Sequence, residues 1–233
     1  MSTLGIIGGI APASTIDYYR LLVEGYRRAR PDGSYPTVLI NSIDLQHFLS
    51  LVTGGDRAAL VSLLLAELDR LAKAGADVAL FASNTPHLVF DELVPRSPLP
   101  LLSIVEAAAR EAQRLGHRQL GLLGTRFTME GGFYPTVFAR YGLTVATPAP
   151  DDQIYVHTRY FAELANGQYR PETRAGFEAV VARLVATAGI DGVILGGTEI
   201  PLLFRDGSAL PVPALDTTAI HVAEAVAALV RAP

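Results

Sequence analysis

The sequence predicts an α/β fold made of two related domains, each with a parallel sheet, and a cleft between them. Short apolar runs alternate with longer amphipathic ones, which is the pattern of parallel strands joined by helices. Residues 77–90 and 191–204 resemble each other, since both run from an apolar stretch into small polar residues and back. Residues 5–9 and 121–125 match at a similar offset, so we interpret the chain as two copies of one unit with a ligand site between them.

The apolar runs mark the expected strands, and the amphipathic stretches between them mark the helices. Strands are predicted at residues 4–8, 36–41, 77–82, 100–103, 119–123, 143–146, 191–196 and 212–215. A first helix runs through Tyr18, Leu22 and Tyr26, with Ser14 and Thr15 as candidate N-terminal caps. Further helices are predicted at residues 58–74, 104–115, 133–141, 153–166, 171–188 and 217–230. Most are followed by glycine, which adopts the left-handed conformation of a helix C-terminus without steric cost.

A boundary between the two halves is expected near Pro98 and Pro100. The first α/β domain is predicted to contain residues 1–98 and 210–233, and it is discontinuous because the final helix returns to it. The second domain is predicted to contain residues 99–209.

Composition limits the classes of protein that this chain can be. Half of its 233 residues are apolar, so it can bury a sizeable core. A net charge of -4, with Lys73 as the only lysine, gives no basic surface for nucleic acid. No apolar run is long enough to span a bilayer, and the N-terminal residues do not form a signal peptide. We therefore expect no nucleic-acid or membrane partner and a cytoplasmic location.

The chain contains no cysteine, which removes disulfides, thiolate zinc sites and cysteine nucleophiles together. The histidines never fall at the close spacing that metal ligands share. They are His47, His87, His117, His157 and His221. No metal site is therefore expected.

A glycine-rich turn follows the first predicted strand. Gly8 and Gly9 lead into a helix, and free backbone amides at such a turn can hold an anion. The turn lacks the later glycine of a dinucleotide fingerprint, and Asn41 rather than an acidic residue ends the second strand. A plain tight turn and an anion-binding turn both stay open, and a nucleotide site is disfavoured.

Small polar residues follow the third predicted strand. Ser83, Asn84 and Thr85 offer hydroxyls, an amide and N–H groups at the carboxyl end of a strand, where open α/β sheets bind ligands. These groups suit a carboxylate or another anion, but the same residues also form local turns. Ser83 lacks the flanking glycines of a nucleophile elbow, which argues against a serine hydrolase.

Titratable residues near the two matching strand ends are candidate acids and bases. Glu199 is the only carboxylate there, and it could exchange protons with a substrate or simply accept backbone hydrogen bonds. His87 follows Ser83 by about one helical turn and could be catalytic or structural. Arg126 could clamp a carboxylate or be solvated. His117 and His221 are expected on helix surfaces, without a functional role.

At these residues the chain resembles the aspartate/glutamate racemase family, whose members racemise amino acids without pyridoxal phosphate. The resemblance covers nearly the whole length of the chain. The residues that carry it are 5–9 with Pro12, Ser14 and Thr15; 17–20; Asn84, Thr85 and His87; 123–126 with 128–130; Gly196 and 198–200; and Asp216, Thr217 and 219–221.

The resemblance implies two pseudo-twofold-related α/β domains, a homodimer and no cofactor. In the family two cysteines exchange the α-proton on opposite faces of the substrate, and their positions hold Ser83 and Gly197 here. The family's substrate carboxylate is held at positions that match Asn84, Thr85 and Thr198. Two further matching positions, which line the family's cleft, are Gly9 and Thr125.

Because both cysteine positions are replaced, the reaction is expected to differ from two-thiol racemisation. The first hypothesis is a cofactor-independent isomerase or lyase acting at the α-carbon of an amino acid or small carboxylate. Ser83, His87 and Glu199 are its candidate catalytic residues. The competing hypothesis is a catalytically silent protein that binds an amino acid or small carboxylate. A third is a racemase whose cysteines have been substituted.

Overall fold

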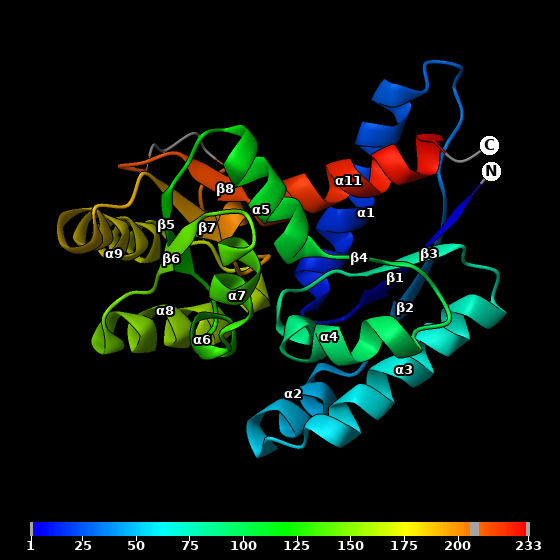
Figure 1. The fold of residues 1–233 in the computed structure, drawn as a ribbon, viewed down its shortest axis with the longest axis horizontal. Helices are drawn as coiled ribbons and strands as arrows, with labels where there is room; N and C mark the ends of the chain where they lie inside the picture. The colour runs from blue at the N-terminus through cyan, green and yellow to red at the C-terminus, as the bar shows by residue number, and fades with distance from the viewer. Residues whose placement is uncertain (1, 206–209, 232–233) are drawn as a thin grey trace. The chain divides into compact units, whose positions relative to one another are not determined.

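The computed structural model describes residues 2–205 and 210–231, which form two four-stranded sheets surrounded by helices (Figure 1). The first sheet contains β1 (Thr3–Gly8), β2 (Thr37–Ser42), β3 (Val78–Phe81) and β4 (Leu101–Leu102). The second contains β5 (Gln119–Leu123), β6 (Thr144–Ala146), β7 (Gly192–Leu195) and β8 (Ala214–Asp216). The predicted strands lie within two residues of these bounds at either end.

Helices connect the strands in both halves. The α-helices are α1 (Pro12–Ala29), α2 (Leu45–Gly54), α3 (Arg57–Lys73), α4 (Phe90–Leu93), α5 (Ile104–Arg114), α6 (Arg126–Glu130), α7 (Phe133–Ala139), α8 (Pro150–Ala162), α9 (Pro171–Ala188), α10 (Ile200–Leu203) and α11 (Thr217–Arg231). Short 3₁₀ segments are η1 (Thr85–Val89), η2 (Val94–Arg96) and η3 (Leu164–Asn166).

The two sheets repeat one topology. Their strand orders are β2-β1-β3-β4 and β6-β5-β7-β8, and every neighbouring pair is parallel. Adding four to each strand number of the first sheet gives the second, so the predicted duplication of an α/β unit is confirmed. In each sheet the segments singled out in the sequence follow the two adjacent central strands, β1 with β3 and β5 with β7.

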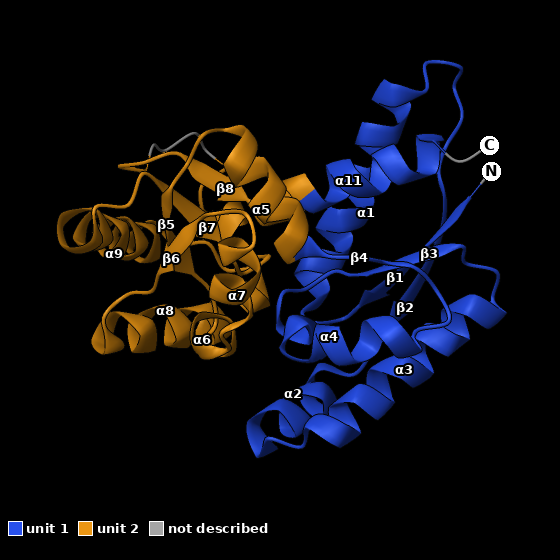
Figure 2. Ribbon diagram, in the orientation of Figure 1, with its two compact units in different colours: residues 1–104, 221–233 blue, residues 105–220 orange. Residues whose placement is uncertain are grey.

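The chain divides into two compact units, residues 1–104 with 221–233 and residues 105–220 (Figure 2). Unit 1 is therefore discontinuous, and the chain re-enters it within α11. The predicted domains, 1–98 with 210–233 and 99–209, place both boundaries earlier along the chain.

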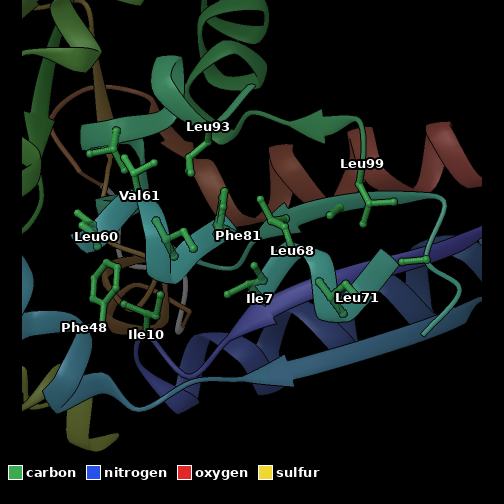
Figure 3. Packing of buried hydrophobic residues seen from close by; sticks show 14 residues of the cluster. Ile7, Ile10, Phe48, Leu60, Val61, Leu68, Leu71, Phe81, Leu93 and Leu99 are labelled. Carbon is green, nitrogen blue, oxygen red and sulfur yellow. The ribbon is translucent and has the colours of Figure 1, made fainter. Parts of the chain in front are cut away.

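Helices cover both faces of the first sheet, because successive side chains of its strands point to opposite faces. Ile7 and Phe81 belong to a buried cluster with apolar residues of α2 and α3 (Figure 3). Leu4, Ile6 and Leu80 belong to a second cluster with residues of α1 and α11. Each such side chain contributes roughly 1.5–3 kcal/mol relative to exposure in water. These two layers fix the carboxyl ends of β1 and β3 in place.

The central strands of the second sheet are buried along most of their length, as expected for a parallel sheet covered on both faces. Leu122 in β5 and Val193 and Ile194 in β7 have no exposed surface. A Cβ added at Gly121 would lie 2.7 Å from Ile190 and 3.1 Å from Leu184 of α9. Glycine at this position therefore lets α9 pack closely on the sheet.

The prediction that Ser14 and Thr15 cap the first helix is wrong, because α1 begins two residues before Ser14. The Ser14 hydroxyl instead donates to the carbonyl of Ala11 at 2.8 Å and that of Ala82 at 3.1 Å. The Thr15 hydroxyl accepts the N–H of Gly9 at 2.9 Å. Both hydroxyls therefore bond the first turn of α1 to the residues that follow β1 and β3.

The sequence did not predict α2. Asp44 caps this helix, since its carboxylate accepts the N–H of His47 at 2.8 Å. Phe48 is the one buried residue among the helix's 10. Leu45, Phe48 and Val52 are spaced as on one face of a helix, so the local sequence does carry a helical pattern here.

The expected surface positions of His221 and His117 are wrong. His221 is fully buried in unit 1, where Tyr18 donates its hydroxyl hydrogen to Nδ1 at 2.9 Å. Its Nε2–H donates to the carbonyl of Leu102 at 3.1 Å. His117 follows α5 in a connecting segment and contacts the carboxylate of Asp191 at 3.1 Å. Both histidines have structural partners that helical periodicity does not reveal.

Candidate functional site

Unit 1 brings several of the predicted site residues together at the carboxyl ends of β1 and β3. We call Gly9, Ser83, Asn84, Thr85 and His87 the first strand-end cluster. All except Gly9 are polar side chains that are at most 6% exposed. They are neighbours because β1 and β3 pair in parallel and both chains turn at the same edge of the sheet.

Gly9 makes the turn at the end of β1. Its φ of 86° lies in the left-handed region that glycine adopts readily. A Cβ there would collide with the carbonyl oxygen of Ile43 and lie 2.8 Å from Oγ of Ser42. The N–H of Gly9 donates to Thr15, so this amide is engaged within the fold. Gly9 therefore allows a close approach of β1 and the segment after β2.

His87 lies in η1, the segment that directly follows Ser83 and Asn84. Its Nε2 is 3.1 Å from the hydroxyl oxygen of Ser103, and its ring stacks on Phe90 with centroids 4.3 Å apart. Burial, with a smaller effect from the charge of His221, lowers the pKa of His87 to about 3. His87 is therefore a neutral imidazole at physiological pH, able to give or accept a hydrogen bond.

Unit 2 forms a corresponding group at the carboxyl ends of β5 and β7. We call Thr125, Tyr160, Gly197, Thr198 and Glu199 the second strand-end cluster. Tyr160 comes from α8, and the other four directly follow the two strands. The predicted binding residues of this half, Thr125, Gly197 and Thr198, are thus brought together with the predicted acid/base residue Glu199.

Glu199 is fully buried and is held by two hydroxyl groups. Tyr160 donates its hydroxyl hydrogen to Oε2 of Glu199. The hydroxyl of Thr198 donates to the same oxygen at 3.0 Å. The two hydroxyl groups therefore treat this carboxylate oxygen as a hydrogen-bond acceptor. Burial, followed by the charge of Glu199, raises the pKa of Tyr160 well above its usual value.

The ring of Tyr160 covers Gly197. A Cβ added at Gly197 would lie 2.6 Å from Cε2 of Tyr160 and 3.0 Å from Cδ1 of Ile200. These separations are shorter than van der Waals contact, so a side chain at Gly197 would have to displace a buried aromatic ring. The glycine and the tyrosine therefore fit each other.

Thr125 and Arg126 follow β5. The hydroxyl oxygens of Thr125 and Thr128 are 3.3 Å apart, and Thr128 also packs against the turn glycine Gly124. Arg126 is exposed, and its backbone N–H donates to Nδ1 of His157 at 3.1 Å. Thr125 is therefore part of the packed strand end, whereas the Arg126 side chain lies in solvent.

Sequence reasoning missed Tyr160. The residue lies on a helix far from Gly197 along the chain and belongs to no motif, so periodicity describes it only as a core position. The one available signal was Gly197 itself, which follows β7 at the position matched by Ser83 in the first half. Such a glycine often marks the close approach of another group.

Among the residues that the structure describes, no group of three or more His, Asp or Glu side chains could hold a metal ion. Over the same residues, none of the helices combines the length and apolar character needed to cross a bilayer.

These features define a protein of two duplicated α/β units with buried polar groups at equivalent strand ends. The sequence model of the Asp/Glu/hydantoin racemase family matches residues 7–225. The chain belongs to this family, so the predicted family is confirmed.

Solved structures agree with this assignment. A Yersinia pestis protein assigned to the Asp/Glu racemases is 35% identical, with 99% of this chain and 100% of that chain covered and a TM-score of 0.88. An aspartate racemase homologue from Pyrococcus horikoshii OT3 is 33% identical, with 100% of both chains covered and a TM-score of 0.82.

A curated relative gives a more distant match. The broad specificity amino-acid racemase RacX of Bacillus subtilis is 24% identical over 145 residues, which are 61% of this chain and 63% of RacX. The match therefore spans less than two thirds of RacX.

Proposed function

We propose that this protein is a cofactor-independent isomerase or lyase that acts at the α-carbon of an amino acid or small carboxylate with chemistry that uses no cysteine. The observation that carries the proposal is Glu199, a fully buried carboxylate two residues after Gly197, the position that matches the family's second cysteine. Proton transfer by a positioned carboxylate contributes about 10²–10⁴-fold to a rate.

The first strand-end cluster supports binding of the substrate carboxylate. Ser83, Asn84 and Thr85 supply two hydroxyls and an amide in a buried setting, and such donors suit a carboxylate without adding charge. In this proposal Ser83 orients the substrate. His87, neutral because its pKa is about 3, takes part as a hydrogen-bonding group.

The distribution of basic residues supports a reaction without pyridoxal phosphate, which is normally attached to an enzyme through a lysine. The single lysine, Lys73, is the last residue of α3. Its side chain is 76% exposed and pairs with Asp69 at 2.6 Å. A Schiff base at either strand-end cluster would need a lysine that the chain does not provide.

The test is exchange of the α-proton in deuterated water, followed by NMR. The substrates are the L and D forms of aspartate, glutamate and alanine, together with succinate and malonate. We expect exchange on at least one compound, and a decrease of roughly 10²–10⁴-fold in Glu199→Gln because the amide cannot accept the proton. No exchange on any compound would refute the proposal.

Glu163→Gln is a matched control for this test. Glu163 is also a buried carboxylate of unit 2, where it accepts a hydrogen bond from Thr173 and pairs with Arg159 at 2.6 Å. It lies outside both strand-end clusters. Loss of exchange in this control as well would indicate that a general loss of structure, and not chemistry at Glu199, explains the Glu199→Gln result.

A catalytically silent protein that binds an amino acid or small carboxylate is the second candidate. The observation that favours it is that Glu199 and His87 both have hydrogen-bonding partners within their own units. Such partners can serve structure alone. Saturable binding of one of the compounds by calorimetry, without α-proton exchange, would support this function instead.

The homodimer and the cytoplasmic location stay predictions. Exposed apolar side chains on unit 1, among them Ile16 at 72% and Tyr19 at 50%, support an association between copies of the chain. Light scattering on the purified protein would measure its mass in solution, and a monomer over the micromolar range would contradict the dimer.

A further inference from the structure

Tyr160 occupies the space beside Gly197 that a side chain at that position would fill. The ring is 6% exposed, and its Cε2 lies 2.6 Å from the position that a Cβ at Gly197 would take. Cε2 adjoins the carbon that bears the hydroxyl, so the phenol oxygen lies close to the end of β7. The polar tip of Tyr160 is therefore brought to the strand end by a helix.

The Tyr160 hydroxyl and Glu199 form a donor–acceptor pair. The hydroxyl donates to Oε2 of Glu199, and Thr198 donates to the same oxygen at 3.0 Å. Glu199 is fully buried and Tyr160 is 6% exposed, so the tyrosine is the more accessible member of the pair. A proton that reaches Glu199 from a bound molecule would pass most directly through this hydroxyl.

We propose that Tyr160 is a catalytic residue of the second strand-end cluster and relays the α-proton of the substrate to Glu199. This inference rests on the function proposed above. In the relay step the α-proton moves from the substrate carbon to the phenol oxygen of Tyr160. The hydroxyl proton of Tyr160 moves to Oε2 of Glu199 in the same step. The C–H electron pair stays on the substrate as an enolate, and Glu199 becomes a neutral acid.

The relay leaves Tyr160 neutral before and after the step. Its raised pKa is consistent with this, since burial and the adjacent carboxylate both disfavour a phenolate. In the return direction Glu199 gives its proton to Tyr160 as Tyr160 protonates the enolate. The pair thus does on one face of the α-carbon what a single acid/base group would do there.

The test compares Tyr160→Phe with the wild-type protein in the exchange assay, using the L and D forms of aspartate, glutamate and alanine separately. Phenylalanine keeps the ring that fills the space beside Gly197 and removes only the hydroxyl. One group serves one face of the α-carbon, so we expect exchange on one enantiomer to fall about 10²–10⁴-fold, mainly through kcat. A structural effect would instead lower the rates of both enantiomers together or raise KM.

Tyr134→Phe is the matched control. Tyr134 lies in α7, has no exposed surface, and its hydroxyl is hydrogen-bonded to Thr217. We expect this variant to exchange both enantiomers as the wild-type protein does.

Three results distinguish this inference from the proposed function. If the wild-type protein exchanges and Tyr160→Phe exchanges both enantiomers equally well, the relay is refuted and the proposed function stands. If the wild-type protein exchanges none of the compounds, both are refuted. If Tyr160→Phe loses exchange on one enantiomer while the wild-type protein and Tyr134→Phe exchange both, the relay is supported.

Isotope effects on the wild-type protein test the relay even if Tyr160→Phe does not fold. In the relay the α-hydrogen and a solvent-derived hydroxyl proton move in one step. We therefore expect an α-deuterium effect and a solvent isotope effect on the same step. Direct transfer to Glu199 would move no solvent-derived proton, so an α-deuterium effect without a solvent effect would refute the relay.

Discussion

The two strand-end clusters lie at equivalent places in one repeated fold, but their side chains differ in chemistry. In unit 1 the residues after β3 are Ser83, Asn84 and Thr85, which are all neutral hydrogen-bonding groups. In unit 2 the residues after β7 are Gly197, Thr198 and Glu199, which include a buried carboxylate. The repeated fold therefore determines where polar groups gather, whereas the individual residues determine what each cluster can do.

The difference extends to the group that packs beside each strand end. In unit 1 the first residue of the polar segment after β3 is Ser83, and the aromatic contact in its cluster is the stack of His87 on Phe90. In unit 2 the position is a glycine because the ring of Tyr160 takes the available space. The two positions therefore have different surroundings, so they should respond differently to the same substitution.

Alanine should affect Gly197 much more than Ser83, its counterpart in unit 1. Its Cβ would lie 2.6 Å from Cε2 of Tyr160, so Gly197→Ala should lower the free energy of unfolding by about 1–3 kcal/mol. Ser83→Ala adds no atom and should cost about 1 kcal/mol or less. Chemical denaturation with urea measures both values.

A double-mutant cycle separates the clash from other effects. In a Tyr160→Leu background the obstructing ring is absent, so Gly197→Ala should cost less, with a coupling of about 0.5–3 kcal/mol. Equal costs in the two backgrounds would show that Tyr160 does not restrict the side chain at Gly197. The same reasoning predicts that cysteine at Gly197 is tolerated only when Tyr160 is replaced by a smaller residue.

The turns after β1 and β5 provide a second contrast. Gly9 has a φ of 86°, so Gly9→Ala should cost about 1–2 kcal/mol from backbone strain, in addition to its collision with the carbonyl of Ile43. Thr125 stands at the equivalent position with a φ of -66°, and Thr125→Ala introduces no such strain.

Gly167→Ala is the control for Gly9→Ala. Gly167 has a φ of 71° and open space around an added Cβ, so this variant reports strain alone. Thermal unfolding of the three variants should rank Gly9→Ala as the least stable. A Gly9→Ala variant as stable as Gly167→Ala would contradict the close approach of Ile43.

A further prediction concerns the response of the first strand-end cluster to pH. Burial, and to a lesser degree the charge of His221, keep the pKa of His87 at about 3, so its imidazole signals should not change between pH 8 and 5. In the unfolded chain a histidine has a pKa of about 6.5. The stability due to neutral His87 is therefore complete above pH 6.5 and decreases as the pH falls toward 3.

His87→Asn removes this proton linkage. Its free energy of unfolding should depend less steeply on pH between about 6.5 and 5 than that of the wild-type protein, by up to one proton. Imidazole signals of His87 that shift between pH 8 and 5 would instead show that the ring is accessible to protons and available as a base.

Much of the fold could be predicted because local patterns carry it. Apolar runs such as those of β5 and β7 are continuous, and the glycines after α3 and α9 mark helix ends. The helix α2 was not predicted, although Leu45, Phe48 and Val52 have helical spacing and Asp44 is a typical N-cap. Of the candidate site, the residues that follow β3 and β7 were predicted from their polar character after apolar strands, but the partner of Glu199 was not.

The sequence by itself determined the strands, the duplication and the polar residues at the strand ends, because each of these depends on neighbours in the chain. Only the tertiary structure decided that Tyr160 covers Gly197 and binds Glu199, and that His221 is buried against Tyr18. These contacts join residues far apart along the chain. Their formation depends on how the helices pack on the sheets, which no local pattern of residues specifies.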